Sequence, residues 1–200
     1  MGESGISKLL MDMDSPSGIV LIETPGVMGE EVALELVKAY KGEKKVAFIT
    51  PKQKRMFKGN PEFSDMDVKV IGEDIHPQEL YQITFAFRNL TRKSKIALLS
   101  LHFLLVFHPA EVVYKLFSEL TKISIDKDLL LIATVDYRIL DLKSLAMFEG
   151  LATHVLEILE VINGFKIKRG IRVKKSPTGG TGFYEISLME GKIQVGEPIE

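Results

Sequence analysis

Short apolar runs alternate with stretches of helical periodicity along the first three quarters of the chain. The runs are rich in aliphatic residues, as is typical of buried strands, and they cover residues 18–23, 45–50, 68–71, 95–101 and 129–134. Between them, apolar residues recur at spacings of three and four, which predicts helices over residues 29–40, 77–91 and 109–124. Strands and helices that alternate in this way predict a mostly parallel sheet with helices on both faces.

After about residue 150 the pattern changes to alternating stretches that read HVLEILEVI, FKIKRGIRVKK and FYEISLMEGKIQV. They are separated by Asn163-Gly164, by the glycine-rich segment 176–182 and by Glu190-Gly191, and Asn-Gly between alternating runs is a strong hairpin signal. We therefore predict one three-layer α/β domain over residues 1–200. It comprises an N-terminal segment (1–17), a parallel body (18–150) and antiparallel C-terminal strands (151–196). The polar segments 51–67 and 176–182 are predicted to be mobile loops.

Composition narrows the function classes. The 200 residues are 46% hydrophobic and 26% charged with a net charge of −1, so nothing global drives binding to nucleic acid or to anionic membranes. The chain has no cysteine, which excludes disulfides, thiol catalysis and zinc–thiolate sites. We see no secretory signal and no apolar stretch near the roughly 20 residues that span a bilayer, so we expect a cytoplasmic protein. Scarce Asn and Gln beside abundant Lys, Glu and Ile indicate a heat-adapted source.

Residues 18–40 have the layout of a nucleotide-binding phosphate loop, in which an apolar run leads through a Pro/Gly turn into a helix. A working loop reads G-x-x-x-x-G-K-[ST]: its amides cradle phosphates, its lysine neutralises them and its hydroxyl holds magnesium. In that register the chain carries Thr24, Pro25, Gly26, Gly29, Glu30 and Glu31. Two carboxylates thus stand where the lysine and the hydroxyl belong, and they would repel a triphosphate.

This strand–loop–helix, followed by four more α/β units and a closing meander, resembles the RecA-like ATPases and in particular their archaeal KaiC-like branch. In that branch a strand of the L-A-D-x-V-I-x-L kind precedes a basic strand, a glycine-containing turn and a final Y-x-I…G-I-x-V pair. Here LATHVLEIL, GIRVKKSPTGGTG and FYEISLMEGKIQV stand in that order. The resemblance covers about residues 15–196, and the chain also resembles an uncharacterised family from Pyrococcus and its relatives.

The resemblance implies catalytic acids that this chain lacks. A magnesium-binding aspartate would end the strand that here ends in Leu98, Leu99 and Ser100. A water-activating glutamate would follow the strand that here leads into Pro51, Lys52 and Gln53. Since the lysine and the hydroxyl of the loop are replaced as well, we expect neither ATP hydrolysis nor a bound cofactor.

Other chemistry finds little support in the sequence. The four histidines have no metal-binding spacing, so no metal site is predicted. His102 and His108 follow a central strand, where ligands bind in open α/β sheets, although a polar edge on a short apolar helix explains them more simply. Glu30 and Glu31 could form a carboxylate pair for acid–base chemistry, but exposed carboxylates also suit the positive end of a helix.

Basic residues gather in two places. One group, Lys52, Lys54, Arg55 and Lys58, follows the second strand. The other lies on the meander and offers candidate phosphate or nucleic-acid contacts: Lys168, Arg169, Arg172, Lys174 and Lys175. Stacking aromatics are few there, so a solvated face or a subunit contact is the preferred interpretation.

The hypothesis that fits best is a catalytically inactive RecA/KaiC-like domain kept as a binding, regulatory or assembly module. We expect it to form a homo-oligomer, with a protein partner as a further option and no membrane contact. Two alternatives stay open. One is a nucleic-acid accessory protein that uses the basic meander, and the other is an enzyme or receptor for a small ligand in the former nucleotide cleft.

Overall fold

The computed structural model describes residues 18–39, 44–59, 63, 65–99, 101–164, 166–189 and 192–199. Its strands are β1 (Gly18–Glu23), β2 (Lys45–Ile49), β3 (Asp67–Val70), β4 (Lys95–Leu98), β5 (Leu130–Val135), β6 (His154–Asn163), β7 (Lys166–Lys175), β8 (Tyr184–Met189) and β9 (Lys192–Pro198). Its helices are α1 (Met28–Ala39), α2 (Pro51–Met56), α3 (Leu80–Arg88), α4 (Leu101–Phe107), α5 (Ala110–Asp126) and α6 (Leu142–Leu151), with a 3₁₀ turn at Tyr137–Ile139.

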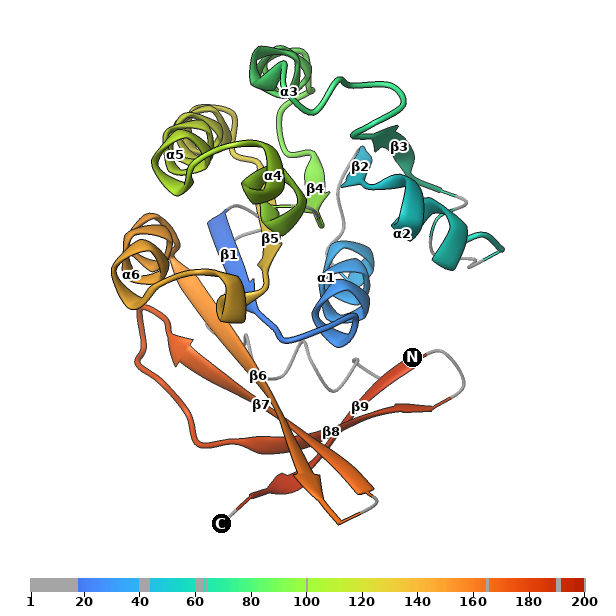
Figure 1. Ribbon diagram of the computed structural model, residues 1–200, viewed down its shortest axis with the longest axis vertical. Helices are drawn as coiled ribbons and strands as arrows, with labels where there is room; N and C mark the ends of the chain where they lie inside the picture. Colours follow the sequence, from blue (N-terminus) through green and yellow to red (C-terminus); the bar gives the residue numbers. More distant parts are fainter. Residues whose placement is uncertain are drawn as a thin grey trace.

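All nine strands join one sheet in the order β3-β2-β4-β5-β1-β6-β7-β8-β9. The six strands from β3 to β6 pair in parallel, and the remaining pairs are antiparallel. This arrangement confirms the predicted α/β class with a mostly parallel sheet and antiparallel C-terminal strands. It also places β1 at the centre of the whole sheet, between β5 and β6 (Figure 1).

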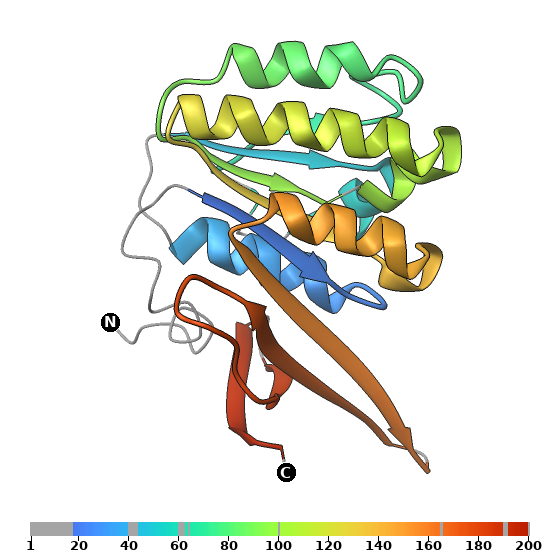
Figure 2. The ribbon, with the colours of Figure 1, turned by 90° about the vertical axis from the view of Figure 1, so that its left-hand side faces the viewer.

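Helices cover both faces of the parallel sheet, which gives three layers (Figures 1 and 2). On one face α1 buries Val32, Leu36 and Val37 in a core that also contains Val20 and Ile22 of β1. On the other face α3, α4, α5 and α6 enclose a second core, built around the rings of Phe87, Phe117 and Phe148. Every residue of β4 and β5 is buried, as expected for central strands covered on both sides.

Several predicted boundaries needed correction. Strand β4 ends at Leu98 and not at Leu101, because Leu101 already begins α4. The segment predicted as a mobile loop after β2 begins with α2, since the Thr50 hydroxyl caps the Gln53 amide and the Gln53 side chain caps the Thr50 amide. Helix α6 was not predicted, although Asp141 accepts a hydrogen bond from the Ser144 amide and marks its start.

Strand β6 belongs to both parts of the sheet. Its first residues, from His154 to Glu157, pair in parallel with β1, while Val155 to Asn163 pair antiparallel with β7. Strand β8 in turn pairs with β7 only at Gly170 and Ile171. Within the part of the chain that the structure describes, residues 159–163 and 166–169 therefore have only each other as strand neighbours, and this two-stranded arm projects from the body (Figure 2).

Candidate functional site

The loop between β1 and α1 is closed on the hydroxyl of Thr24. The Oγ1 atom of Thr24 accepts hydrogen bonds from the amides of Gly26 and Gly29, each at 3.3 Å, and donates to the Gly26 carbonyl at 3.0 Å. The next two amides, of Glu30 and Glu31, donate to the carbonyl of Val27 at 2.9 and 3.2 Å. These are the amides that point at the ligand in a phosphate-binding loop. Here each of them is bonded within the loop itself.

Thr24 and Gly29 fit each other closely. A Cβ atom placed on Gly29 would lie 2.4 Å from Cγ2 and 2.6 Å from Cβ of Thr24. At Gly26 the same added atom would meet nothing within 4 Å. Glycine is therefore required at position 29 because the Thr24 side chain occupies the concave side of the loop.

Glu30, which stands at the position of the phosphate lysine, is buried and not exposed at the helix end as we expected from the sequence. Its residue exposure is 8%, and its Oε1 atom accepts a hydrogen bond of 2.8 Å from Gln53 Nε2. Desolvation by burial raises the pKa of Glu30 from 4.5 to about 7, against the lowering effects of the Gln53 hydrogen bond and the Lys52 charge. A carboxyl group at this position offers no fixed positive charge to a phosphate.

Gln53 joins three elements at this point. Its Nε2 atom donates both to Glu30 and, at 2.6 Å, to the carbonyl of Leu99 just after β4, while its Oε1 atom accepts from the Thr50 amide. Leu98 and Leu99, at the positions expected for the magnesium aspartate, are buried and apolar. Ser100, the third of those positions, lies outside the described residues.

A small polar cleft of about 190 Å³ opens where the strands end. It is lined by side chains of the loop after β1, of α1, α2, α4 and β5, and of the chain that follows β5: Thr24, Val27, Glu30, Lys52, His102, Thr134, Asp136 and Arg138. Asp136 accepts two hydrogen bonds from the Arg138 guanidinium, at 2.9 and 2.6 Å, and these hold the pKa of Asp136 below its usual range. Burial lowers the pKa of His102, so its ring is neutral at pH 7.

The two histidines singled out in the sequence thus have different positions. His102 lines the cleft opposite Asp136, whereas the Nε2 atom of His108 lies 2.8 Å from the carbonyl of Pro77 and links α4 to the start of α3. Sequence reasoning discounted His102 and missed Asp136, Arg138 and Thr134. The sequence could have indicated these residues by their position, because they lie at or just beyond the carboxyl ends of two central strands.

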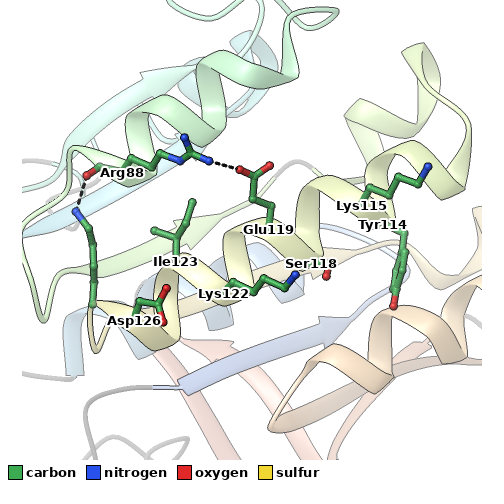
Figure 3. A pocket seen from close by; sticks show the side chains of 9 residues that line it. Arg88, Tyr114, Lys115, Ser118, Glu119, Lys122, Ile123 and Asp126 are labelled. Carbon is green, nitrogen blue, oxygen red and sulfur yellow. Dashed lines mark hydrogen bonds and ion pairs between the residues drawn. The ribbon is translucent and has the colours of Figure 1, made fainter.

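A larger groove of about 760 Å³ runs along α5 beside α3 (Figure 3). Its charged side chains are partly engaged with one another: Arg88 donates to Glu119 at 2.6 Å, and the ammonium group of Lys127 donates to the carbonyl of Arg88 (Figure 3). The groove is shallow and open, and it lies away from the strand ends. We therefore place the candidate site at the smaller cleft.

The basic residues of the meander are mostly engaged. Arg169 donates to Glu160 at 2.7 Å and Arg172 to Glu157 at 2.6 Å, while the Arg172 guanidinium also lies over the ring of Phe183. Lys174 donates to Glu23 and to Glu149, each at 2.9 Å, and Lys175 caps the carbonyls of Glu149 and Ala152 at the end of α6. Lys168 is exposed, and the described part of the chain gives it no partner.

The register of β7 against β6 is regular through Gly170 and up to Val173, so Lys168 and Arg172 lie on one face of the strand pair and Arg169 on the other. Beyond Val173 an irregularity shifts the register and pairs Lys175 with Val155, so the alternation does not extend to Lys174 and Lys175. The charges of Arg169 and Arg172 are compensated by Glu160 and Glu157 on the neighbouring strand β6. The cation cluster is therefore a mixed-charge surface.

Among the residues that the structure describes, no group of three or more His, Cys, Asp or Glu side chains could hold a metal ion. No helix over those same ranges is long and apolar enough to cross a bilayer.

Compared by sequence, the chain matches no described protein family and no curated protein. Compared by structure, it is similar to the crystal structure of a KaiC-like protein from the hyperthermophilic archaeon Pyrococcus horikoshii. The TM-score is 0.63, the sequence identity is 12%, and the match covers 90% of each chain. At this identity the likeness concerns the fold alone. The fold of the chain is thus similar to that of a KaiC-like protein, and it includes the antiparallel C-terminal strands that the sequence predicted.

Proposed function

We propose that this chain is a RecA-type domain that does not hydrolyse nucleoside triphosphates and acts as a binding or assembly module. The observation that carries the proposal is the closed loop. The amides of Gly26, Gly29, Glu30 and Glu31 are bonded to Thr24 and Val27, so a phosphate would have to break those bonds to enter.

The surroundings of the loop favour the same conclusion. The 190 Å³ cleft is smaller than the roughly 300–1,000 Å³ of typical small-molecule pockets. Glu30 replaces the cation that would neutralise the phosphates, and Asp136 adds a second acidic group to the same cleft. A triphosphate would therefore meet a narrow site with two carboxyl groups.

Calorimetric titration with Mg-ATP and Mg-GTP tests this proposal. We expect no binding heat, because the loop amides are already bonded and Glu30 stands in place of the lysine that would neutralise the phosphates. Glu30→Lys with Glu31→Thr should not restore turnover, since Leu99 still provides no magnesium ligand. A micromolar dissociation constant for ATP, or hydrolysis by the double variant, would overturn the proposal.

For the assembly role we propose a homo-oligomer in which the arm contacts a second copy of the chain. The arm exposes Val161, Ile162 and Ile167, with exposed fractions of 58%, 76% and 54%. A two-stranded ribbon on its own is at best marginally stable in water, and its free edges can pair with another strand. An identical arm is a suitable partner, because symmetric contacts place the same surface on both copies.

Analytical ultracentrifugation of Ile162→Thr with Ile167→Thr tests the assembly role. We expect the wild type to sediment as an oligomer and the double variant to dissociate at concentrations where the wild type does not. Ile125→Thr is the matched control, because Ile125 is an isoleucine of similar exposure (63%) on α5. A monomeric wild type, or equal dissociation of the control, would contradict the role of the arm.

We further propose that the meander does not bind nucleic acid, because four of its five candidate cations are engaged with carboxylates or carbonyls. Fluorescence anisotropy with single- and double-stranded oligonucleotides at two salt concentrations is the measurement. Binding through several phosphates would weaken with salt at a slope of about −0.9 per phosphate on B-DNA. Tight binding that is lost in Lys168→Glu with Arg172→Glu would reverse this ranking.

A further inference from the structure

Two buried polar atoms in the cleft have no hydrogen-bond partner among the described residues. They are Oε2 of Glu30 and the hydroxyl oxygen of Thr134, whose residue exposures are 8% and 1%. Buried polar groups in folded proteins are almost always bonded, and an unmet one is unfavourable. Both atoms belong to residues that line the same small cleft, so one bound molecule could satisfy both.

The size of the cleft limits that molecule. Its 190 Å³ corresponds to about six water molecules at roughly 30 Å³ each. A short-chain carboxylate fits this space, and a nucleoside does not.

The charged side chains around the cleft limit the sign of the charge that the bound molecule can carry. Lys52 of α2 has no ion-pair partner among the described residues, while Arg138 uses Nε and Nη2 to hold Asp136. Glu31 of α1 also acts on the charge of Glu30 but does not line the cleft, and burial lowers the pKa of His102 of α4. When Glu30 carries a proton, Lys52 is therefore the lining side chain whose charge no described ion pair balances.

We propose that the cleft binds a small monoanion of the carboxylate class, which pairs with Lys52 and receives hydrogen bonds from Thr134 and from protonated Glu30. An ammonium ligand is disfavoured by Lys52 and Arg138, and a dianion or triphosphate is disfavoured by Glu30 and Asp136. The inference rests on the proposed function to the extent that no nucleotide occupies this place.

A proton then binds together with the anion. Burial raises the pKa of Glu30 to about 7, and a neighbouring anion favours the protonated form further. Because only the protonated carboxyl donates, the affinity for the anion should be highest below the pKa of Glu30 and should fall as the pH rises through it. Between pH 6 and pH 8 the expected loss is about tenfold.

Titration with sodium acetate, followed by the ring resonances of His102 in NMR spectra, tests the site. His102→Gln assigns those resonances among the four histidines. We expect a saturable shift at pH 6, with affinity about tenfold weaker at pH 8. Ethylammonium chloride, as the cation probe, should cause no saturable shift at either pH.

Three variants sharpen the result. Glu30→Gln keeps an N–H donor at the position of the protonated carboxyl, so acetate should still bind at pH 6 and the pH dependence should disappear. Lys52→Gln should weaken binding severalfold at every pH. Lys54→Gln is the matched control, because Lys54 lies on the same helix but is exposed and pairs with Glu73; it should leave the affinity unchanged.

The failure of the proposed site can be distinguished from the failure of the proposed function. No saturation with acetate, binding of ethylammonium instead, or an unchanged pH dependence in Glu30→Gln would each overturn the proposed site. Equal effects of Lys52→Gln and Lys54→Gln would indicate that acetate binds only as an adventitious additive and would also overturn the site. Mg-ATP added to the same samples tests the proposed function separately, since ATP binding would overturn that proposal whatever acetate does.

Discussion

The loop after β1 and the arm formed by β6 and β7 differ in which of their chemical groups are left free to make contacts. In the loop, polar groups that could serve a ligand are bonded to one another, as the Thr24 hydroxyl and the amide of Gly29 show. On the arm, apolar side chains that would normally be covered, such as Ile162 and Ile167, are exposed to solvent. The difference shows that the loop laid out like a phosphate-binding loop has its polar groups bonded internally. The part that resembles a simple sheet extension offers free contact surface.

The largest expected effect lies at the base of the arm. Ile158 and Ile162 lie on the same face of β6, but Ile158 is fully buried in the core. Ile158→Ala should reduce the free energy of unfolding by about 2–5 kcal/mol, since it leaves a cavity. Urea unfolding monitored by circular dichroism measures this. A small loss would show that the base of the arm, like its tip, is not part of the packed core.

Second in size is the effect of pH on the buried carboxyl of Glu30. As the pH rises from 4.5 to about 7, the unfolded chain loses this proton first, so the folded state loses stability over that interval. Glu30→Gln has no proton to lose. Its free energy of unfolding should equal that of the wild type near pH 4.5 and exceed it by about 3 kcal/mol at pH 8.

Unfolding of both proteins at several pH values checks this difference. Burial also raises the pKa of Glu23 to about 7, although the Lys174 hydrogen bond opposes the rise. That carboxyl is present in wild type and variant alike, so the difference between them isolates Glu30. A stability difference that does not change with pH would show that Glu30 is ionised in the folded state.

The third prediction addresses the closed loop. Gly29→Ala should destabilise the chain by about 1–3 kcal/mol, because the new methyl group collides with Thr24. Gly26→Ala, three residues away and with open space around it, should be close to neutral. Thermal unfolding compares the two variants. In a double-mutant cycle, Thr24→Gly should relieve part of the cost of Gly29→Ala, and strictly additive effects would contradict the proposed fit.

The smallest effect is expected at the tip of the arm. Ile162→Thr should change the unfolding free energy of the dissociated chain by less than about 0.5 kcal/mol, because the side chain is 76% exposed. Urea unfolding at low protein concentration measures this. A large loss would mean that the tip is packed against the body and would weaken the contrast with the loop.

Much of the fold could be predicted from local patterns. The predicted strand over 18–23 coincides with β1, and the aliphatic run near residue 130 gave β5 to within one residue at each end. Helix α2 was missed because its sequence is polar and basic and has no apolar periodicity, although the pairing of Thr50 with Gln53 is a readable cap. Strand β4 was predicted too long, since a continuous apolar run does not show where a strand gives way to a buried helix.

The candidate site was less accessible to sequence reasoning. The replacement of a lysine by Glu30 is visible in one motif, because all its residues are consecutive. The closure of the loop by Thr24 depends on a side-chain orientation that no periodicity encodes. The approach of His102, Thr134 and Asp136 depends on β4 and β5 ending at the same edge of the sheet, which only the strand order determines.

The central position of β1 has a consequence for the newly made chain. Its neighbours, β5 and β6, are synthesised about a hundred residues later, so the first strand leaves the ribosome long before either can pair with it. At a synthesis rate of about 5–20 residues per second the delay is roughly 5 to 20 seconds. During this time Ile19 to Ile22, all fully buried in the finished fold, have no sheet to join. Strand β1 is thus unprotected until both of its neighbours have been made, and chaperone binding should concentrate there during translation.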